Sequence, residues 1–346
     1  MKLLIVTQKL DKEDENLGFF HRWLEEFARH AARVTVIVSS LGTHSLPPGV
    51  SVHSLGKEKG SRKIRRLWRF WELFSYHYVR SDAVLFHMIP EFVVAASPFL
   101  LSLRRPAGLW YVHKSVTRLL KFAERVLDYI FTASNLSFRL PSKKVIYTGH
   151  GIDTEFFKPA SSSPRPVTGL RLLTAGRISP VKDIETLIRA CAFLKENWNR
   201  EFTLSIVGGP LMARDASYSD SLKNLVEEKG LVNRVIFYGA RPYTEIASVY
   251  RDHDLFVSMS TTGSIDKAVL EAMASGMTVV TANEAFRSLL PAKYFLEKRS
   301  PEFVAERIKA IAEEARPNLV LRELVVKNHS ISRTVQEIIA RLKNIP

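Results

Sequence analysis

Two basic side chains, Arg177 and Lys182, follow a hydrophobic stretch that ends in Gly176. The glycine lets the backbone turn, and a helical pattern begins at residue 184, so both cations lie beside the start of a helix. A helix N-terminus attracts phosphate through its amide groups and its dipole, and Arg and Lys add charge-assisted hydrogen bonds. The pattern predicts a diphosphate site, although Arg and Lys on a surface are more often only solvated.

A second segment, 254–276, runs from a hydrophobic stretch through a loop of Ser, Thr and Gly into a short helix closed by Gly276. The loop amides and the helix N-terminus would point at one place, which suits a phosphate. The residues that we predict to contact the ligand here are Gly263, Ser264, Ile265 and Asp266.

Glu271 lies inside that short helix among apolar residues, where a solvated carboxylate would be out of place. It either accepts hydrogen bonds from ribose hydroxyl groups or pairs with a Lys or Arg. Weaker signals are Gly208-Gly209 and Gly239, which end two other hydrophobic stretches. Backbone can approach a ligand closely at such glycines, but they are equally typical of loops.

The elements that must position these residues alternate between short β-branched runs and helical patterns, which is typical of βαβ units around a parallel sheet. Apolar residues at helical spacing predict a helix over 19–30 that leaves Arg22, Glu25 and Glu26 outside, and β-branched runs predict strands that include 202–207 and 278–281. The same rhythm stops at the Pro- and Ser-rich stretch 159–166 and then restarts, so this stretch is the expected linker. We predict an α/β chain with two Rossmann-like parallel-sheet domains, 1–160 and 167–324, that face a central cleft. The chain from Pro317 reads as two short helices broken near 329–332, and the tail, 325–346, is expected to pack back onto the first domain. Ligands of such sheets bind at the carboxyl ends of the strands.

The order of these motifs resembles that of the retaining glycosyltransferases of family four, which have the GT-B fold. The resemblance rests on Gly-Arg-x4-Lys, strand-Gly-Gly-Pro, strand-Tyr-Gly and Asp-Leu-Phe-Val-Ser followed by Leu-Glu-Ala-Met-Ala-Ser-Gly. It implies that Arg177 and Lys182 hold the diphosphate of a nucleoside diphosphate sugar and that Glu271 binds its ribose. It also implies that Gly18 lies near the donor phosphates and that His113 faces the reacting sugar. The alternative for His113 is a strand-end histidine bonded to backbone.

Two positions depart from the family pattern. The family has two glutamates separated by seven residues, and Gly263 stands at the position of the first. Asp266 and Lys267 lie nearby and are candidates to replace that carboxylate, at a different spacing. Asp183 stands where a glycine commonly follows the lysine.

The function implied by the resemblance is transfer of a sugar to a glycan or lipid-linked acceptor in cell-envelope polysaccharide or glycolipid synthesis. The first domain would bind the acceptor and the second the donor. No metal ion and no cofactor are expected besides the nucleoside diphosphate sugar, which is a substrate. The alternatives are a non-catalytic sugar-nucleotide or glycan-binding protein on the same fold and a sugar-nucleotide epimerase.

Composition adds a requirement for an anionic partner. The 346 residues include 50 Lys and Arg against 35 Asp and Glu, a formal net charge of +15, and most of this surplus lies in residues 1–160.

Residues 57–80 interleave basic and aromatic side chains and predict an amphipathic helix with Ile64, Leu67, Trp68, Trp71, Phe74 and Tyr78 on one side. Its opposite side carries the basic residues Arg62, Arg65, Arg66 and Arg69. The aromatic side either packs on the first sheet or the helix docks on an anionic membrane surface. Nucleic acid is not expected, because no stacking module or recognition helix is present.

The sequence also limits the location of the protein. Its longest apolar run, 92–103, is shorter than the roughly 20 residues of a spanning helix, and its start lacks the pattern of a signal peptide. We expect a cytoplasmic protein that is either free or peripheral at the inner face of the cell membrane. The one cysteine, Cys191, reads as a buried core residue.

Overall fold

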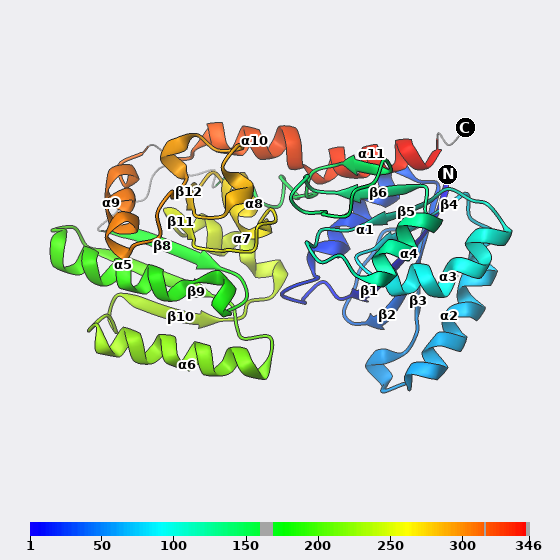
Figure 1. Cartoon of the computed structure of the whole chain (residues 1–346), viewed down its shortest axis with the longest axis horizontal. Helices are drawn as coiled ribbons and strands as arrows, with labels where there is room; N and C mark the ends of the chain where they lie inside the picture. The colour runs from blue at the N-terminus through cyan, green and yellow to red at the C-terminus, as the bar shows by residue number, and fades with distance from the viewer. Residues whose placement is uncertain (160–168, 315, 344–346) are drawn as a thin grey trace. The chain divides into compact units, whose positions relative to one another are not determined.

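The computed structural model describes residues 1–159, 169–314 and 316–343, apart from the side chains of Ala213 and Arg214. The chain forms two compact units (Figure 1). Unit 1 comprises Met1–Asp153, Pro242–Thr244 and Asn328–Pro346, and unit 2 comprises Thr154–Arg241 and Glu245–Lys327. Most of the expected linker, 159–166, lies outside the described residues.

Unit 1 contains a seven-stranded parallel sheet in the order β3-β2-β1-β4-β5-β6-β7. Its strands are β1 (Lys2–Leu10), β2 (Arg33–Leu41), β3 (Val50–Ser54), β4 (Ala83–His87), β5 (Ala107–Trp110), β6 (Tyr129–Thr132) and β7 (Val145–Tyr147). The prediction of a parallel α/β sheet is confirmed. The sequence analysis missed β3, a short strand at the edge of the sheet whose side chains remain partly exposed, so it carries little hydrophobic signal.

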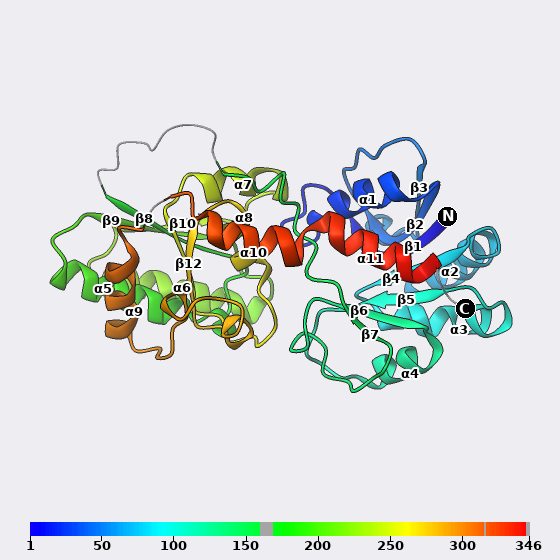
Figure 2. The same cartoon turned by 90° about the horizontal axis from the view of Figure 1, so that it is seen from above.

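The helices of unit 1 lie on both faces of this sheet, as Figure 2 shows for α1 on one side and α3 and α4 on the other. They are α1 (Phe19–His30), α2 (Lys63–Tyr78), α3 (Pro90–Ser102), α4 (Arg118–Val126) and α11 (Ile331–Lys343), with the short η1 (Lys57–Lys59). The helix expected over 19–30 has those bounds, and Trp23 and Phe27 on its apolar face are fully buried. Glu26, predicted to lie outside, is 4% exposed. It is tolerated there because Arg29 and His30 donate to its carboxylate.

The basic helix α2 buries only part of the apolar side predicted for it. Phe70, Phe74 and Tyr78 are buried, whereas Ile64 and Trp68 are 62% and 65% exposed. The prediction of one continuous apolar side is therefore wrong for the first turns, because only the C-terminal part of α2 packs against core side chains of the sheet and of α3. Among the arginines, Arg62, Arg65 and Arg69 are exposed, and Arg66 is half-buried.

Unit 2 contains a five-stranded parallel sheet in the order β10-β9-β8-β11-β12. Its strands are β8 (Leu170–Ala175), β9 (Phe202–Val207), β10 (Val235–Gly239), β11 (Leu255–Ser258) and β12 (Thr278–Thr281). The elements that follow these strands are η2 (Pro180–Lys182), α5 (Ile184–Asn197), α6 (Ala213–Glu228), α7 (Tyr243–Arg251), α8 (Lys267–Ala274), η3 (Glu284–Phe286), η4 (Ala292–Tyr294), α9 (Pro301–Ile311) and α10 (Leu319–His329). Cys191 is fully buried in the core, as predicted, and burial raises the pKa of its thiol to about 12, so it stays protonated.

The C-terminal tail breaks at Ser330, between α10 and α11, close to the place expected from the sequence. Ser330 pairs with Ile152, and the Thr334 hydroxyl donates to the carbonyl of Thr148 at 2.8 Å. Helix α11 packs against α1, so the last residues of the chain complete the cover of the unit 1 sheet.

Candidate functional site

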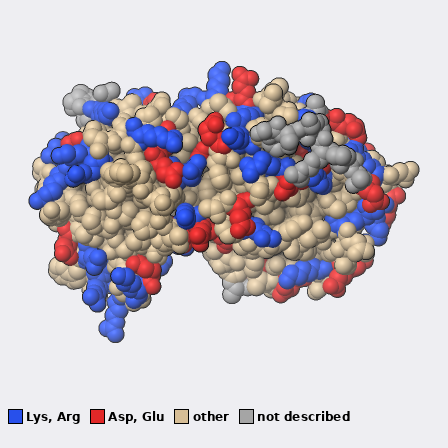
Figure 3. Space-filling view, turned by 180° about the vertical axis from the view of Figure 1, so that it is seen from behind, with Lys and Arg blue, Asp and Glu red and all other residues tan. Residues whose placement is uncertain are grey.

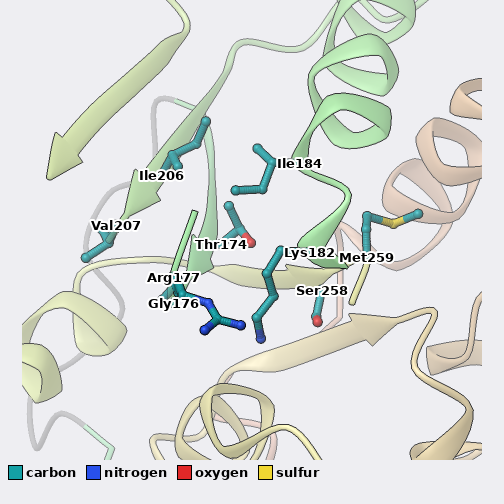
Figure 4. A pocket seen from close by; sticks show the side chains of 10 residues that line it. Thr174, Gly176, Arg177, Lys182, Ile184, Ile206, Val207, Ser258 and Met259 are labelled. Atoms are coloured by element: carbon teal, nitrogen blue, oxygen red, sulfur yellow. The ribbon is translucent and has the colours of Figure 1, made fainter. Parts of the chain in front are cut away.

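A small pocket lies at the carboxyl ends of β8, β9 and β11 in unit 2 (Figure 4). Its lining residues are Thr174, Ala175, Gly176, Arg177, Lys182, Ile184, Ile206, Val207, Ser258 and Met259. Strand β9 follows β8 on one side and β11 lies on the other, so the strand order reverses between β8 and β11. This is the switch point where open α/β sheets bind their ligands.

Glycine backbones bring the walls of the pocket together. A Cβ atom at Gly208 would lie 2.0 Å from the carbonyl oxygen of Gly176, so the ends of β8 and β9 approach each other more closely than a side chain would allow. Asp183, which ends η2, has φ 48. This left-handed conformation favours glycine, and Asp is among the few other residues that adopt it. Aspartate in place of the family's glycine at residue 183 therefore keeps the turn between η2 and α5.

The two predicted cations both line this pocket. Figure 4 shows the side chains of Arg177 and Lys182 reaching the same region from the turn after β8 and from η2. Arg177 is half-buried, and it has no hydrogen-bond or ion-pair partner among the residues that the structure describes. A half-buried guanidinium with its donors unused is poised to bind an anion.

Lys182 already has an anionic partner. Its Nζ lies 2.6 Å from Oδ2 of Asp266, and the two side chains are 19% and 9% exposed. Asp266 is also the N-cap of α8, since its Oδ1 accepts from the backbone amide of Ala268 at 3.3 Å. The lysine and the N-terminus of α8 are therefore joined through one carboxylate.

Glu271 lies on α8 and is 5% exposed. Lys267, one turn earlier, places Nζ 2.8 Å from its Oε1, and the hydroxyl of Tyr250 on α7 donates to its Oε2 at 3.0 Å. Of the two alternatives for Glu271, the structure contains the ion pair. Burial lowers the pKa of Lys267, and the neighbouring glutamate partly opposes this shift. Tyr250 was missed, because nothing local in the sequence distinguishes it from any aromatic core residue.

The loop before α8 is tied to its surroundings through backbone groups. Thr261 donates its amide to the carbonyl of Val181 at 2.9 Å, and the Asn283 side chain donates to the carbonyl of Ser264 at 2.8 Å. Ile265 is buried, and Gly263 has φ 65, a conformation in which glutamate would be strained. The backbone here is thus fitted to glycine rather than to the carboxylate of the family pattern.

Gly239 has φ 69, and its carbonyl accepts from the amide of Gly208 at 2.8 Å. Gly239, Ser264 and Glu271 do not line the pocket that contains Arg177 and Lys182. The pocket instead includes Thr174, Ser258 and Met259, which the sequence analysis did not select because only the strand order shows that the ends of β8 and β11 are neighbours.

The other two predicted site residues, Gly18 and His113, belong to unit 1. A Cβ atom at Gly18 would lie 2.5 Å from the carbonyl oxygen of Asp14 and 2.6 Å from the Cβ of Tyr243, which explains the glycine. His113 lies in the exposed loop after β5, and its Nδ1 accepts from the amide of Ser115 at 3.1 Å. A neutral ring with Nδ1 as acceptor carries its proton on Nε2, which remains available to donate.

Within residues 1–159, 169–314 and 316–343, no group of three or more His, Cys, Asp or Glu side chains could hold a metal ion. No helix in the same residues is both long and apolar enough to cross a bilayer. Figure 3 shows one face of the molecule, on which basic and acidic side chains are mixed over both units.

Comparison with known proteins adds sequence and fold relatives. Residues 157–322 match the family described as Glycosyl transferases group 1. The chain is 32% identical over 142 residues to the D-inositol 3-phosphate glycosyltransferase of Corynebacterium glutamicum (strain R), covering 38% of this chain and 34% of that protein. It is 28% identical over 184 residues to the putative colanic acid biosynthesis glycosyltransferase WcaL of Escherichia coli (strain K12), covering 50% of this chain and 43% of that protein. The chain thus spans less than half of these two relatives.

Solved structures match over the whole chain. HepE from Anabaena, in complex with UDP and glucose, matches with a TM-score of 0.76 and 18% identity over 100% of both chains. Sucrose-phosphate synthase from Thermosynechococcus elongatus matches with a TM-score of 0.76 and 15% identity over 99% of this chain and 98% of that chain. The chain therefore has the GT-B fold of these glycosyltransferases, and its segment 157–322 matches the group 1 glycosyl transferases in sequence.

Proposed function

We propose that the protein is a retaining glycosyltransferase of family four. It moves a sugar from a nucleoside diphosphate sugar to a glycan or lipid-linked acceptor in the synthesis of cell-envelope polysaccharide or glycolipid. The observation that carries this proposal is the pocket at the switch point of unit 2, where Arg177 and Lys182 converge within the segment that matches the group 1 glycosyl transferases. The names of the relatives support glycosyl transfer, and the UDP in the HepE structure supports the donor class.

In this proposal the diphosphate of the donor binds at Arg177 and Lys182, and these cations stabilise the negative charge that develops as the sugar leaves. The reaction needs no metal ion, because fixed side-chain charges supply this stabilisation. Glu271 receives the ribose hydroxyls and is held in place by Tyr250 and Lys267. His113 donates from Nε2 to the reacting sugar or to the acceptor.

A panel of nucleotides tests the donor class. We expect the matching nucleoside diphosphate sugar, at about 100 times its Kd, to stabilise the protein by about 2.7 kcal/mol, seen as a rise in Tm, while the free sugar gives none. Donors with UDP, GDP and ADP are compared, and the one that stabilises is then tested for sugar transfer and for slow hydrolysis, without added metal and with chelator. Stabilisation by none of these donors would contradict the proposal.

A second candidate function is a non-catalytic sugar-nucleotide-binding protein on the same fold. It is favoured by Gly263, which provides no carboxylate where the family pattern has a glutamate. Its left-handed backbone, with φ 65, also disfavours a glutamate there. The same panel separates the two functions. Stabilisation by a donor without transfer or hydrolysis would support the binding protein, and turnover would support the enzyme.

We further propose that the first turns of α2 dock on an anionic membrane surface, where a lipid-linked acceptor would be found. Ile64 and Trp68 are largely exposed here beside the exposed Arg62 and Arg65. Exposed apolar side chains within a basic segment suit the interface of an anionic bilayer, where each basic residue contributes about 1 kcal/mol. On the neighbouring side of α3, helix α4 adds Leu119 and Phe122, which are 39% and 38% exposed.

Liposome flotation tests this surface. We expect the protein to float with vesicles that contain anionic lipid and not with neutral vesicles. The double substitution Arg62→Gln/Arg65→Gln should lower the partition coefficient roughly 30-fold, since it removes about 2 kcal/mol of attraction. The control is Val232→Ser with Arg189→Gln, which changes exposed apolar and basic residues of unit 2 and should leave flotation unchanged. If the wild-type protein does not float at low salt, the membrane proposal is wrong.

A further inference from the structure

We infer that Asp266 is a built-in competitor of the donor diphosphate for Lys182. This inference rests on the proposed function and adds a regulatory contact to the same site. Its carboxylate pairs with the ammonium group of Lys182, and this pairing weakens the binding of a nucleoside diphosphate, so that the product of transfer leaves more readily.

The carboxylate of Asp266 contacts two groups of kinds that bind phosphate, a lysine ammonium and a helix N-terminal amide. Oδ2 of Asp266 lies 2.6 Å from Nζ of Lys182, and Oδ1 accepts from the amide of Ala268 in the first turn of α8. A lysine side chain and the amides of a helix N-terminus are the groups that proteins use to bind phosphate. Asp266 therefore makes the contacts that a phosphate oxygen would make on this side of the site.

The burial of the pair makes the competition effective. The side chains of Lys182 and Asp266 are 19% and 9% exposed, so water screens their attraction less than that of a surface ion pair. An incoming diphosphate either displaces the carboxylate from Lys182 or binds beside it. In both cases a fixed negative charge opposes the negative charge of the ligand, while Arg177, with no partner among the described residues, attracts it.

The neighbouring residue does not share this role. Lys267 pairs with Glu271, with Nζ 2.8 Å from Oε1. The two adjacent candidates to replace the carboxylate missing at Gly263 thus have different partners. Asp266 pairs with Lys182, the lysine proposed to bind the diphosphate, and Lys267 pairs with the buried Glu271.

The test is the substitution Asp266→Asn in the full chain, with binding measured by isothermal titration calorimetry. Asparagine is as good an N-cap as aspartate, so the start of α8 is kept while the charge is removed. The probes are inorganic pyrophosphate, which has no base, and UDP, GDP and ADP. We expect Kd for pyrophosphate and for the preferred nucleoside diphosphate to fall about tenfold, and kcat and KM for transfer to fall together as product release becomes slower.

The matched control is Asp183→Asn, which removes one negative charge from the turn that carries Lys182. Asp183 accepts from the Thr186 hydroxyl at 2.8 Å and does not pair with Lys182, and asparagine also adopts its left-handed conformation. This variant should change Kd less than about twofold. If Asp266→Asn does not fold, Asp266→Ser keeps a capping hydroxyl and is expected to tighten binding as well.

The outcomes separate this inference from the proposed function. Tighter binding by Asp266→Asn alone supports the competition. Unchanged or weaker binding by this variant, with a wild-type protein that binds the probes, overturns the competition and leaves the diphosphate site intact. Absence of binding by both proteins overturns the diphosphate site and the competition together.

Discussion

The substitutions Arg177→Ala and Lys182→Ala are each expected to lower kcat/KM for sugar transfer by roughly 10- to 150-fold, with the larger effect for Arg177. A hydrogen bond to a charged group contributes about 1.5–3 kcal/mol, and loss of that much transition-state stabilisation gives this range. The guanidinium can form two such bonds to a phosphate. Its donors have no partner among the described residues, so Arg177 breaks no existing contact when it binds the phosphate. Lys182 gives up its contact with Asp266 to bind, which reduces its net contribution.

The measurement is initial-rate kinetics with the donor identified by thermal stabilisation, together with the Kd of the nucleoside diphosphate. Arg189→Ala is the matched control, because Arg189 lies on α5 with its side chain 42% exposed and pairs with Glu185 outside the pocket. It should leave both quantities unchanged. Near-normal turnover in both the Arg177 and the Lys182 variants would show that the diphosphate does not bind there.

The second large effect concerns the stability of unit 1 in acid. His87 is 1% exposed, its ring stacks on Phe20 with centroids 3.9 Å apart, and its Nδ1 is hydrogen-bonded to the Thr7 hydroxyl. Burial lowers the pKa of His87 to about 3, and burial lowers the pKa of His329 to about 4. Nδ1 of His329 accepts from the amide of His150, a bond that protonation of this nitrogen would break.

Both histidines have a folded-state pKa below the ordinary histidine value of 6.5, so the unfolded chain binds more protons than the native chain below that pH. Their contribution to stability is complete above pH 6.5 and is lost as the pH falls toward 4. The free energy of unfolding should therefore decrease by about 1.4 kcal/mol per pH unit for each histidine in this range. Together they account for about 5 kcal/mol by pH 4.5, which is a large part of the stability of an ordinary domain.

Urea unfolding at a series of pH values between 7.5 and 4.5 measures this loss. In His87→Phe, whatever its stability at neutral pH, the slope of unfolding free energy against pH should be smaller by about 1.4 kcal/mol per unit. His44→Phe changes an exposed histidine in the same unit and should keep the wild-type slope. Equal slopes in the wild-type protein and in His87→Phe would mean that His87 is not held neutral by burial.

Several parts of the fold could be predicted from the sequence because they depend on local patterns. The apolar residues of 19–30 recur at helical spacing, and the helix has those bounds. The strands of unit 2 are short β-branched runs, and 202–207 and 278–281 were predicted with the bounds of β9 and β12. The edge strand β3 and the exposed first turns of α2 could not be predicted, because their burial depends on what packs against them rather than on their own periodicity.

The sequence by itself determined that this chain alternates strands and helices and that Arg177 and Lys182 follow one strand on one turn, since residues close in sequence stay close in space. Only the tertiary structure decided which partners these residues have. Lys182 meets Asp266 across 84 residues because β11 pairs with β8 and brings its loop to the carboxyl end of that strand. Glu271 likewise receives its hydrogen bond from Tyr250, and Thr7 meets His87 because β1 pairs with β4. Charge and hydrogen bonding act over a few ångströms, so the chemistry of the site depends on strand order, which no local pattern records.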